Sequence, residues 1–175
     1  MANIVPERGY NFKVYLNGTD MLGIAEANFP SIEFSTQEIK GAGIAGAIDS
    51  PNVGQTDSMT VSLTWRIIQK PIVKLAVPDV LNIEMWQDME SYNAGAGRIR
   101  RTGAYAYMKA RTKKLDLGKL VVGEVMDTQT EHEVYYLKLS IDGSEILEID
   151  KYNYIYKIQG VDYMAEVRRN LGMAV

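Results

Sequence analysis

Cysteine is absent from this chain of 175 residues. Its absence excludes disulfide bonds, thiolate metal sites and a cysteine nucleophile, and it fits a protein made in a reducing cytosol. Histidine is almost absent too, since His132 is the only one. In a strand its neighbours Glu131 and Glu133 point away from it, so the three side chains do not form a ligand set. We expect His132 to lie on the surface, with no metal or catalytic role.

Long apolar runs are missing as well. No stretch reaches the ~18 apolar residues that suggest a membrane-spanning helix. The N-terminus carries Pro6, Glu7 and Arg8 where a secretory signal has its apolar segment. We therefore expect a soluble, unprocessed chain without a membrane anchor. A chain of this length fits one domain with its own core, and we assign residues 1–175 to it.

Net charge is small but unevenly spread. The formal charge of −3 and the pI of about 5.3 argue against capture of nucleic acid by the whole surface. Residues 98–114 nevertheless hold seven cations and no acid, whereas residues 118–150 hold eight acids and two lysines. Two interpretations stay open. Either the chain has a basic and an acidic surface that attract copies head to tail, or two solvated strands simply differ in charge.

What the sequence does contain is a period-two alternation of apolar and polar residues, which predicts a mainly β fold. The clearest strand covers residues 58–67, with one apolar face for the core. Its other face carries short hydroxyl side chains: Ser58, Thr60, Ser62 and Thr64. The dipeptides Asn17-Gly18 and Asp142-Gly143 predict two-residue hairpin turns, the first leading into a strand over residues 21–29.

Helices are expected at only two places. Pro71 and Pro78 suit the start and the end of a short helix. Near the C-terminus, Asp162 suits the N-cap of a second helix. Its apolar stripe, Met164, Val167 and Leu171, predicts a lid packed over a sheet.

The glycine-rich segment at residues 41–54 contains a literal G-x-G-x-x-G, the spacing of a dinucleotide-binding turn. Here the context fails, because Pro51 leaves no room for a helix and Arg66 stands where an acid is needed. We interpret the segment as a long loop of small residues that lies against another subunit. No serine sits in a nucleophile elbow and no cofactor is expected, although a mechanism that uses only carboxylates stays open.

One strand offers an alternative function. Tyr105 and Tyr107 share a strand face with Lys109, Arg111 and Lys113, as in a stacking platform followed by phosphate contacts. This pattern is the best case for a nucleic-acid-binding β module. We prefer the other interpretation, a solvated strand whose tyrosines pack at an interface, because the chain as a whole is acidic.

The C-terminal forty residues carry a family resemblance. They resemble the C-terminal signature of the major tail tube proteins of contractile-tailed phages and phage-tail-like bacteriocins. The matching residues are Val134-Tyr135-Tyr136-Leu137-Lys138-Leu139, Ile141-Asp142-Gly143, Glu148-Ile149-Asp150, Asn153, Gly160-Val161-Asp162, Arg168-Arg169 and Gly172. The N-terminal hairpin, the glycine loop and the strand at residues 56–68 follow the family order, while residues 70–101 depart from it.

This resemblance implies a structural subunit and not an enzyme. It implies a β-sandwich or barrel-like fold whose copies close into a multi-subunit barrel of six per ring, with rings stacked into a tube inside a contractile sheath. The implied partners are the sheath, the tape measure, the baseplate hub and the tail terminator, with DNA passing through the lumen unbound if the particle is a phage. The location is then a virion or bacteriocin particle assembled in the bacterial cytoplasm, and the choice between the two stays open.

Three surfaces follow as expectations from the resemblance and the charges. The segment at residues 40–55 is expected to extend between subunits and stack rings, through Gly41, Gly43, Ile44, Gly46, Ile48 and Asp49. The hydroxyl face, Ser58, Thr60, Ser62 and Thr64, is expected to line the lumen. Contacts with the sheath or with neighbouring subunits are expected from Arg98, Arg100, Arg101, Lys109, Arg111 and Lys113.

Overall fold

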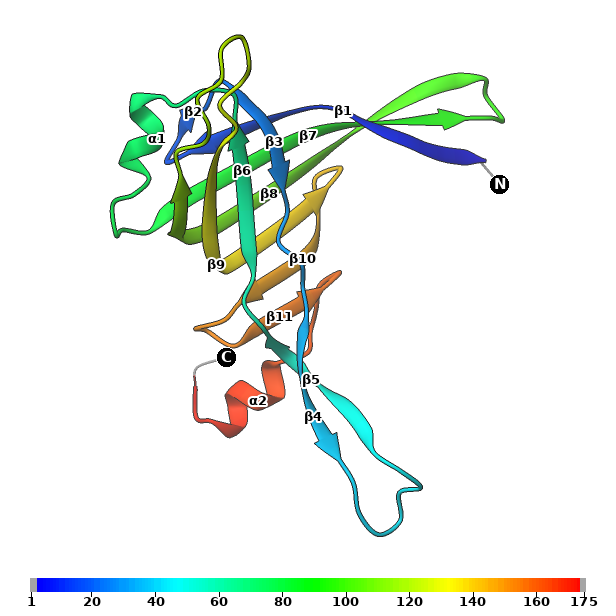
Figure 1. The fold of residues 1–175 in the computed structure, drawn as a ribbon. Helices are drawn as coiled ribbons and strands as arrows, with labels where there is room; N and C mark the ends of the chain where they lie inside the picture. The colour runs from blue at the N-terminus through cyan, green and yellow to red at the C-terminus, as the bar shows by residue number, and fades with distance from the viewer. Residues whose placement is uncertain (1–2, 174–175) are drawn as a thin grey trace.

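The computed structural model describes residues 3–173 and consists of strands with two short helices (Figure 1). The mainly β prediction is therefore confirmed. The strands are β1 (Ile4–Leu16), β2 (Thr19–Asp20), β3 (Ile24–Asn28), β4 (Phe34–Ile39), β5 (Ile48–Thr56), β6 (Thr60–Trp65), β7 (Leu81–Asn93), β8 (Arg98–Asp116), β9 (Thr128–Ile141), β10 (Ser144–Asp150), β11 (Ile155–Ile158) and β12 (Val161–Asp162). The helices are α1 (Lys70–Lys74) and α2 (Ala165–Asn170).

A ten-stranded antiparallel sheet organises the chain in the order β12-β11-β10-β9-β8-β7-β1-β2. Strand β9 changes partner along its length, because residues 128–133 pair with β6 while residues 136–141 pair with β10. Strand β3 continues the β6 branch. Side chains of β6 then share one apolar cluster with those of β1, β7 and β8. Strands β4 and β5 form a separate two-stranded sheet that projects from the rest (Figure 1).

The core uses the alternation that the sequence shows. Met59, Val61, Leu63 and Trp65 are almost fully buried, as predicted for one face of the strand, while Ile67 lies beyond the end of β6 and is exposed. The opposing wall comes from β1, β7 and β8, through Val14, Leu16, Ile83, Met85, Ala106, Met108 and Ala110. The wall on β8 includes two small residues, Ala106 and Ala110.

Both predicted two-residue turns are confirmed. Asn17 and Gly18 have φ of 50° and 76°, and Asp142 and Gly143 have φ of 52° and 77°, as a type I′ turn requires. The first hairpin is shorter than predicted, because β2 pairs with only two residues of β1. At Gly23, with φ of 87°, the chain turns away, and β3 joins β6 instead.

The two helices differ in how well the sequence predicted them. Helix α1 has Pro71 in its first turn, as predicted, but it ends at Lys74 and not at Pro78; its Ile72 is buried. Helix α2 corrects the prediction of an apolar lid, because Val167 and Leu171 are exposed while Arg168 is buried. Arg168 donates to Asp162 at 2.6 Å and to the Tyr154 carbonyl at 2.7 Å. Of the predicted stripe only Met164 is buried, and the ion pair and carbonyl contact of Arg168 hold the rest of the helix.

His132 is also a correction, because it is fully buried and not on the surface. Within β9 the ladder skips Tyr135 between two pairs with β8, Lys109 with Tyr136 and Ala110 with Val134. One extra residue in a strand reverses which face the following side chains occupy. The reversal places His132 on the core face with Thr130 and Val134, whereas the sequence pattern alone suggested the opposite.

Candidate assembly surfaces

The β4–β5 hairpin is the longest projection at one end of the molecule (Figure 1). The predicted loop at residues 40–55 is partly strand, since β5 begins at Ile48 and its ladder pairs Ile39 with Ile48 and Glu38 with Asp49. Gly41, Gly43, Ile44 and Gly46 form the irregular tip between the strands. The three tip glycines have positive φ and empty space around them, so conformation and not crowding selects glycine there.

The base of this hairpin is packed against the C-terminal part of the chain. Phe34 meets Tyr156 edge to face, with ring centroids 5.7 Å apart. Gly54 lies so close to Met164 that an added Cβ would sit 2.4 Å from the Met164 sulfur. These contacts hold the base while the tip extends into solvent. Ile39 and Ile48 lie opposite each other near the tip and are 46% and 55% exposed.

The hydroxyl face of β6 is half-exposed and polar across its neighbours. On the face turned away from the core, the hydroxyl side chains of β6 lie beside polar side chains of β9. The pairs are Thr60 with Glu133, Ser62 with Glu131 and Thr64 with Gln129. Ser58, just before β6, donates to a Glu133 carboxylate oxygen at 2.6 Å. The face thus combines short hydroxyls with carboxylates.

Four of the seven cations of residues 98–114 form ion pairs within the chain: Arg100, Arg101, Lys113 and Lys114. Strand β8 lies directly beside the acidic strand β9, so Lys114 reaches Glu131 at 3.2 Å and Lys113 reaches Glu133 at 3.9 Å. This pairing favours the second interpretation, two strands that differ in charge, because antiparallel pairing brings the two segments together. At such exposed sites each pair contributes little to stability.

The predicted contact cations are also spread along β8 and do not form one patch. Arg98, Arg100 and Arg101 lie toward the β7–β8 tip, and Arg100 pairs with Asp142 at 3.1 Å. At the other half of the strand, Lys109 lies 5.5 Å from the centre of the Tyr136 ring, and Arg111 points to the Pro78 carbonyl at 3.5 Å.

The sequence pattern did not predict one buried carboxylate, which lies where β1, β7 and β8 leave the main body. Glu90 is only 4% exposed and is paired with Arg8 at 2.8 Å and Arg101 at 3.0 Å. The Arg101 guanidinium also lies 3.9 Å from the centre of the Tyr10 ring. The cluster ties β1, β7 and β8 together where they leave the main body. Nothing near Glu90 in the sequence signals it, because its partners come from distant positions.

The tyrosines of the alternative hypothesis are occupied by neighbours. Tyr105 packs against the half-exposed Trp86, with ring centroids 4.2 Å apart, and its hydroxyl donates to Glu84 at 3.3 Å. Burial, with the nearby Glu84 carboxylate, raises the pKa of Tyr105. Tyr107 donates to Asn82 at 2.8 Å. Neither ring is therefore an open platform.

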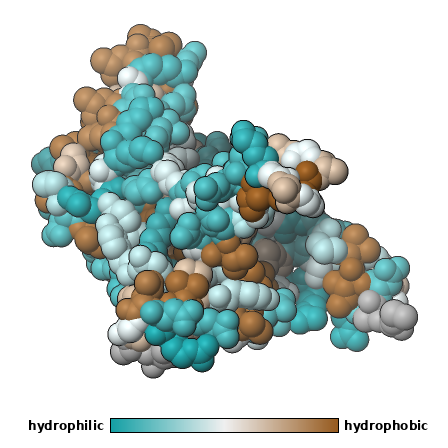
Figure 2. Space-filling view, turned by 90° about the horizontal axis from the view of Figure 1, so that it is seen from below, coloured by the Kyte–Doolittle hydropathy of each residue, from teal (hydrophilic) through white to brown (hydrophobic). Residues whose placement is uncertain are grey.

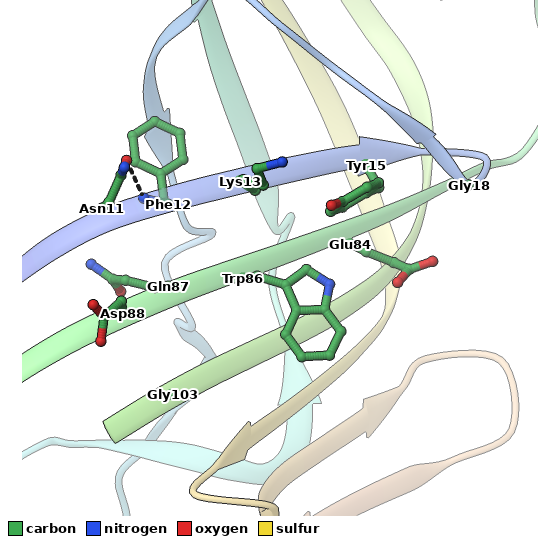
Figure 3. A pocket seen from close by; sticks show the side chains of 10 residues that line it. All are labelled: Asn11, Phe12, Lys13, Tyr15, Gly18, Glu84, Trp86, Gln87, Asp88 and Gly103. Atoms are coloured by element: carbon green, nitrogen blue, oxygen red, sulfur yellow. Dashed lines mark hydrogen bonds between the residues drawn. The ribbon is translucent and has the colours of Figure 1, made fainter. Parts of the chain in front are cut away.

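Trp86 borders a surface hollow of about 590 Å³ beside β1 and β7 (Figure 3). Aromatic and charged side chains share its lining, and Figure 3 shows Glu84 and Asp88 on β7, one on each side of Trp86 along the strand. Asp88 pairs with Arg101, and the Glu84 carboxylate beside Tyr105 repels a phosphate backbone. The geometry therefore gives the nucleic-acid-binding module no support.

Candidate metal-binding groups and membrane-spanning helices were the remaining features to consider. No group of three or more acidic or histidine side chains gathers at metal-binding range within residues 3–173. In that same range, no helix is long and apolar enough to span a membrane.

Comparison with known proteins points to one family. The profile of the family described as "Phage tail tube protein FII" matches residues 6–172. The tail tube protein of Escherichia phage P2 is 27% identical, over 97% of this chain and 99% of that protein. The major tail tube protein of Serratia phage KSP20 is 26% identical, over 89% of this chain and 90% of its own length.

A solved structure shares the fold. It is a chain from the cryo-EM structure of an extracellular contractile injection system, the PVC sheath/tube terminator in its extended state. The TM-score is 0.54 at 12% identity, over 77% of this chain and 96% of that one.

Proposed function

Since this chain belongs to the phage tail tube protein FII family and is a structural subunit of a tail tube, not an enzyme, we propose how it assembles. Six copies close into a ring, and rings stack into a hollow conduit inside a contractile sheath. The particle is a phage or a headless bacteriocin that forms in the bacterial cytoplasm. Sheath, tape measure, baseplate hub and terminator proteins are its further partners.

The observation that carries this proposal is the β4–β5 hairpin. A projecting tip whose glycines have open space around them, on a base fixed by Phe34 and Gly54, is suited to reach a neighbouring ring. Gly41, Gly43, Ile44, Gly46, Ile48 and Asp49 are the residues we assign to that stacking contact. The domain is then residues 1–175, with residues 40–55 as the inter-subunit extension.

Sheet closure between copies is supported by the open edge of β1. This strand pairs with β7 along its whole length on one side, but with β2 only at Tyr15 and Leu16 on the other. Uncovered strand edges pair with other chains unless they are blocked, and a barrel closed across subunits removes them.

We assign the hydroxyl face and the cations of β8 to different contacts because of their chemistry. Ser58, Thr60, Ser62 and Thr64 suit a lumen wall, since short hydroxyls hydrate well and carry no positive charge that would bind passing DNA. Arg98, Arg100, Arg101, Lys109, Arg111 and Lys113 are assigned to the sheath or to neighbouring subunits. A structure of the tube with the hydroxyl face turned away from the pore would overturn the lumen assignment.

Shortening the hairpin tip tests the stacking role. Replacing residues 40–47 by Asn-Gly leaves the Ile39 and Ile48 pair intact and supplies a type I′ turn. We expect a folded chain, with an unchanged circular dichroism spectrum, that forms no tubes in negative-stain micrographs at concentrations where the unaltered chain does. The control carries Ala42→Ser and Ala45→Ser, keeps the length of the tip and is expected to form tubes. Normal tubes from the shortened hairpin would exclude the role.

A further inference from the structure

The loop at residues 117–127, between β8 and β9, carries an exposed apolar tip that the assembly surfaces above do not use. Leu120 is 88% exposed and Val122 is fully exposed, with Val121 and Val125 also at the surface. Single exposed apolar residues are ordinary, but a cluster of them on one projection marks an interaction site. We call residues 117–127 the apolar loop.

The apolar loop is held in one shape by polar contacts at its base. The Lys119 amide donates to the Met126 carbonyl at 2.8 Å, and the Met126 amide donates to the Arg66 carbonyl at 2.8 Å. The Lys119 ammonium reaches Glu124 at 3.1 Å and Asp127 at 3.4 Å. A loop held in this way presents its apolar tip with little entropy left to lose on binding.

The apolar loop and the β4–β5 hairpin project from opposite ends of the molecule (Figure 1). Beside the apolar loop, α1 and the segments that flank it add exposed apolar side chains, among them Ile67, Val73 and Val77. Figure 2 looks from below, where hydrophobic residues form separate patches within a mostly hydrophilic surface. The exposed Ile39 and Ile48 belong to the hairpin that projects from that lower end.

We propose that the apolar loop binds the β4–β5 hairpin of a second copy of this chain, with Leu120 and Val122 packed against the partner's Ile39 and Ile48. The inference rests on the proposed function, because it names the surface that receives the stacking hairpin. Copies stacked in one orientation bring the loop end of one against the hairpin end of the next, which is a heterologous contact that repeats along an axis. Each end then covers apolar area that the isolated chain leaves in water.

Cysteine cross-linking tests this contact directly, because the chain has no cysteine of its own. The double variant Val122→Cys, Ile48→Cys is assembled and treated with a mild oxidant. We expect a ladder of covalently linked chains on a non-reducing gel. The matched control is Val122→Cys, Ile99→Cys, since Ile99 is 58% exposed against 55% for Ile48 and lies on the β7–β8 tip. A ladder from the control alone, or from neither variant, overturns the proposal.

The variant Leu120→Ser, Val122→Ser provides a second measurement. We expect at least a tenfold higher concentration for tube formation, with an unchanged unfolding midpoint because both side chains are already exposed. Normal tube growth from this variant, while the shortened hairpin forms no tubes, would exclude the apolar loop and leave the proposed function standing. Absence of tubes from the unaltered chain at any concentration would overturn the proposed function, and this inference with it.

Discussion

Lowering the pH from 7 to 4 is expected to remove about 3 kcal/mol of unfolding free energy through His132 alone. Burial lowers the pKa of His132 from 6.5 to about 4. As the pH falls, His132 therefore binds a proton near pH 6.5 in the unfolded chain, but only near pH 4 in the folded chain. The contribution of the neutral imidazole is fully present above pH 6.5 and is lost as the pH falls through that window.

The hydrogen bonds around His132 explain why the neutral ring fits. Thr112 gives its hydroxyl proton to the Leu75 carbonyl, so the imidazole Nδ1 donates to Thr112 at 3.2 Å. Thr130 accepts from the Trp65 indole at 3.3 Å, and its own proton is free for the imidazole Nε2 at 3.1 Å. A second proton on the ring, at Nε2, would face the hydroxyl proton of Thr130. The buried imidazolium would then have no acceptor there, and a buried charge without a partner is costly.

The matched variant is His132→Gln, which keeps a polar side chain but cannot titrate. Urea unfolding followed by tryptophan fluorescence at several pH values gives the free energy of each protein. We expect the variant to be less stable at pH 7.5 and the gap to close toward pH 4.5. A gap that stays constant across this range would show that His132 does not bind its proton at a lowered pKa.

Replacing Gly118 by alanine is expected to destabilise the chain by about 2 to 5 kcal/mol. Gly118 has φ of 81°, and an added Cβ would lie 2.2 Å from the Met126 carbonyl oxygen. The first effect is the ordinary strain of a left-handed residue. The second is a clash with backbone, which a side chain cannot relieve by rotating.

Gly123→Ala separates the two effects. Gly123 lies in the same apolar loop with φ of 82°, but an added Cβ there has nothing within 4 Å. This variant should cost only about 1 to 2 kcal/mol, from the backbone conformation alone. Urea unfolding of both variants measures the difference. Equal losses would mean that the loop moves freely and that its base is not closed around Gly118.

The local features of this fold were within reach of sequence reasoning. The type I′ turns at Asn17-Gly18 and Asp142-Gly143, the helix at Pro71 and the buried face of β6 all depend on a few adjacent residues. The glycine tip of the β4–β5 hairpin was found for the same reason, because glycine alone adopts such backbone conformations at no steric cost. The exposure of the apolar loop was not predicted, since its residues look like any other apolar segment.

The sequence by itself thus determined the β character, the turns and the glycine-rich excursion that we assign to stacking, but not the strand β5 within it. Only the tertiary structure decided the burial of His132, the pairing of the β8 cations with β9 and the buried face of α2. Each of these depends on which strands become neighbours, and on a single extra residue at Tyr135 that reverses inside and outside. Strand pairing joins residues far apart in the chain, so a local pattern contains no record of it.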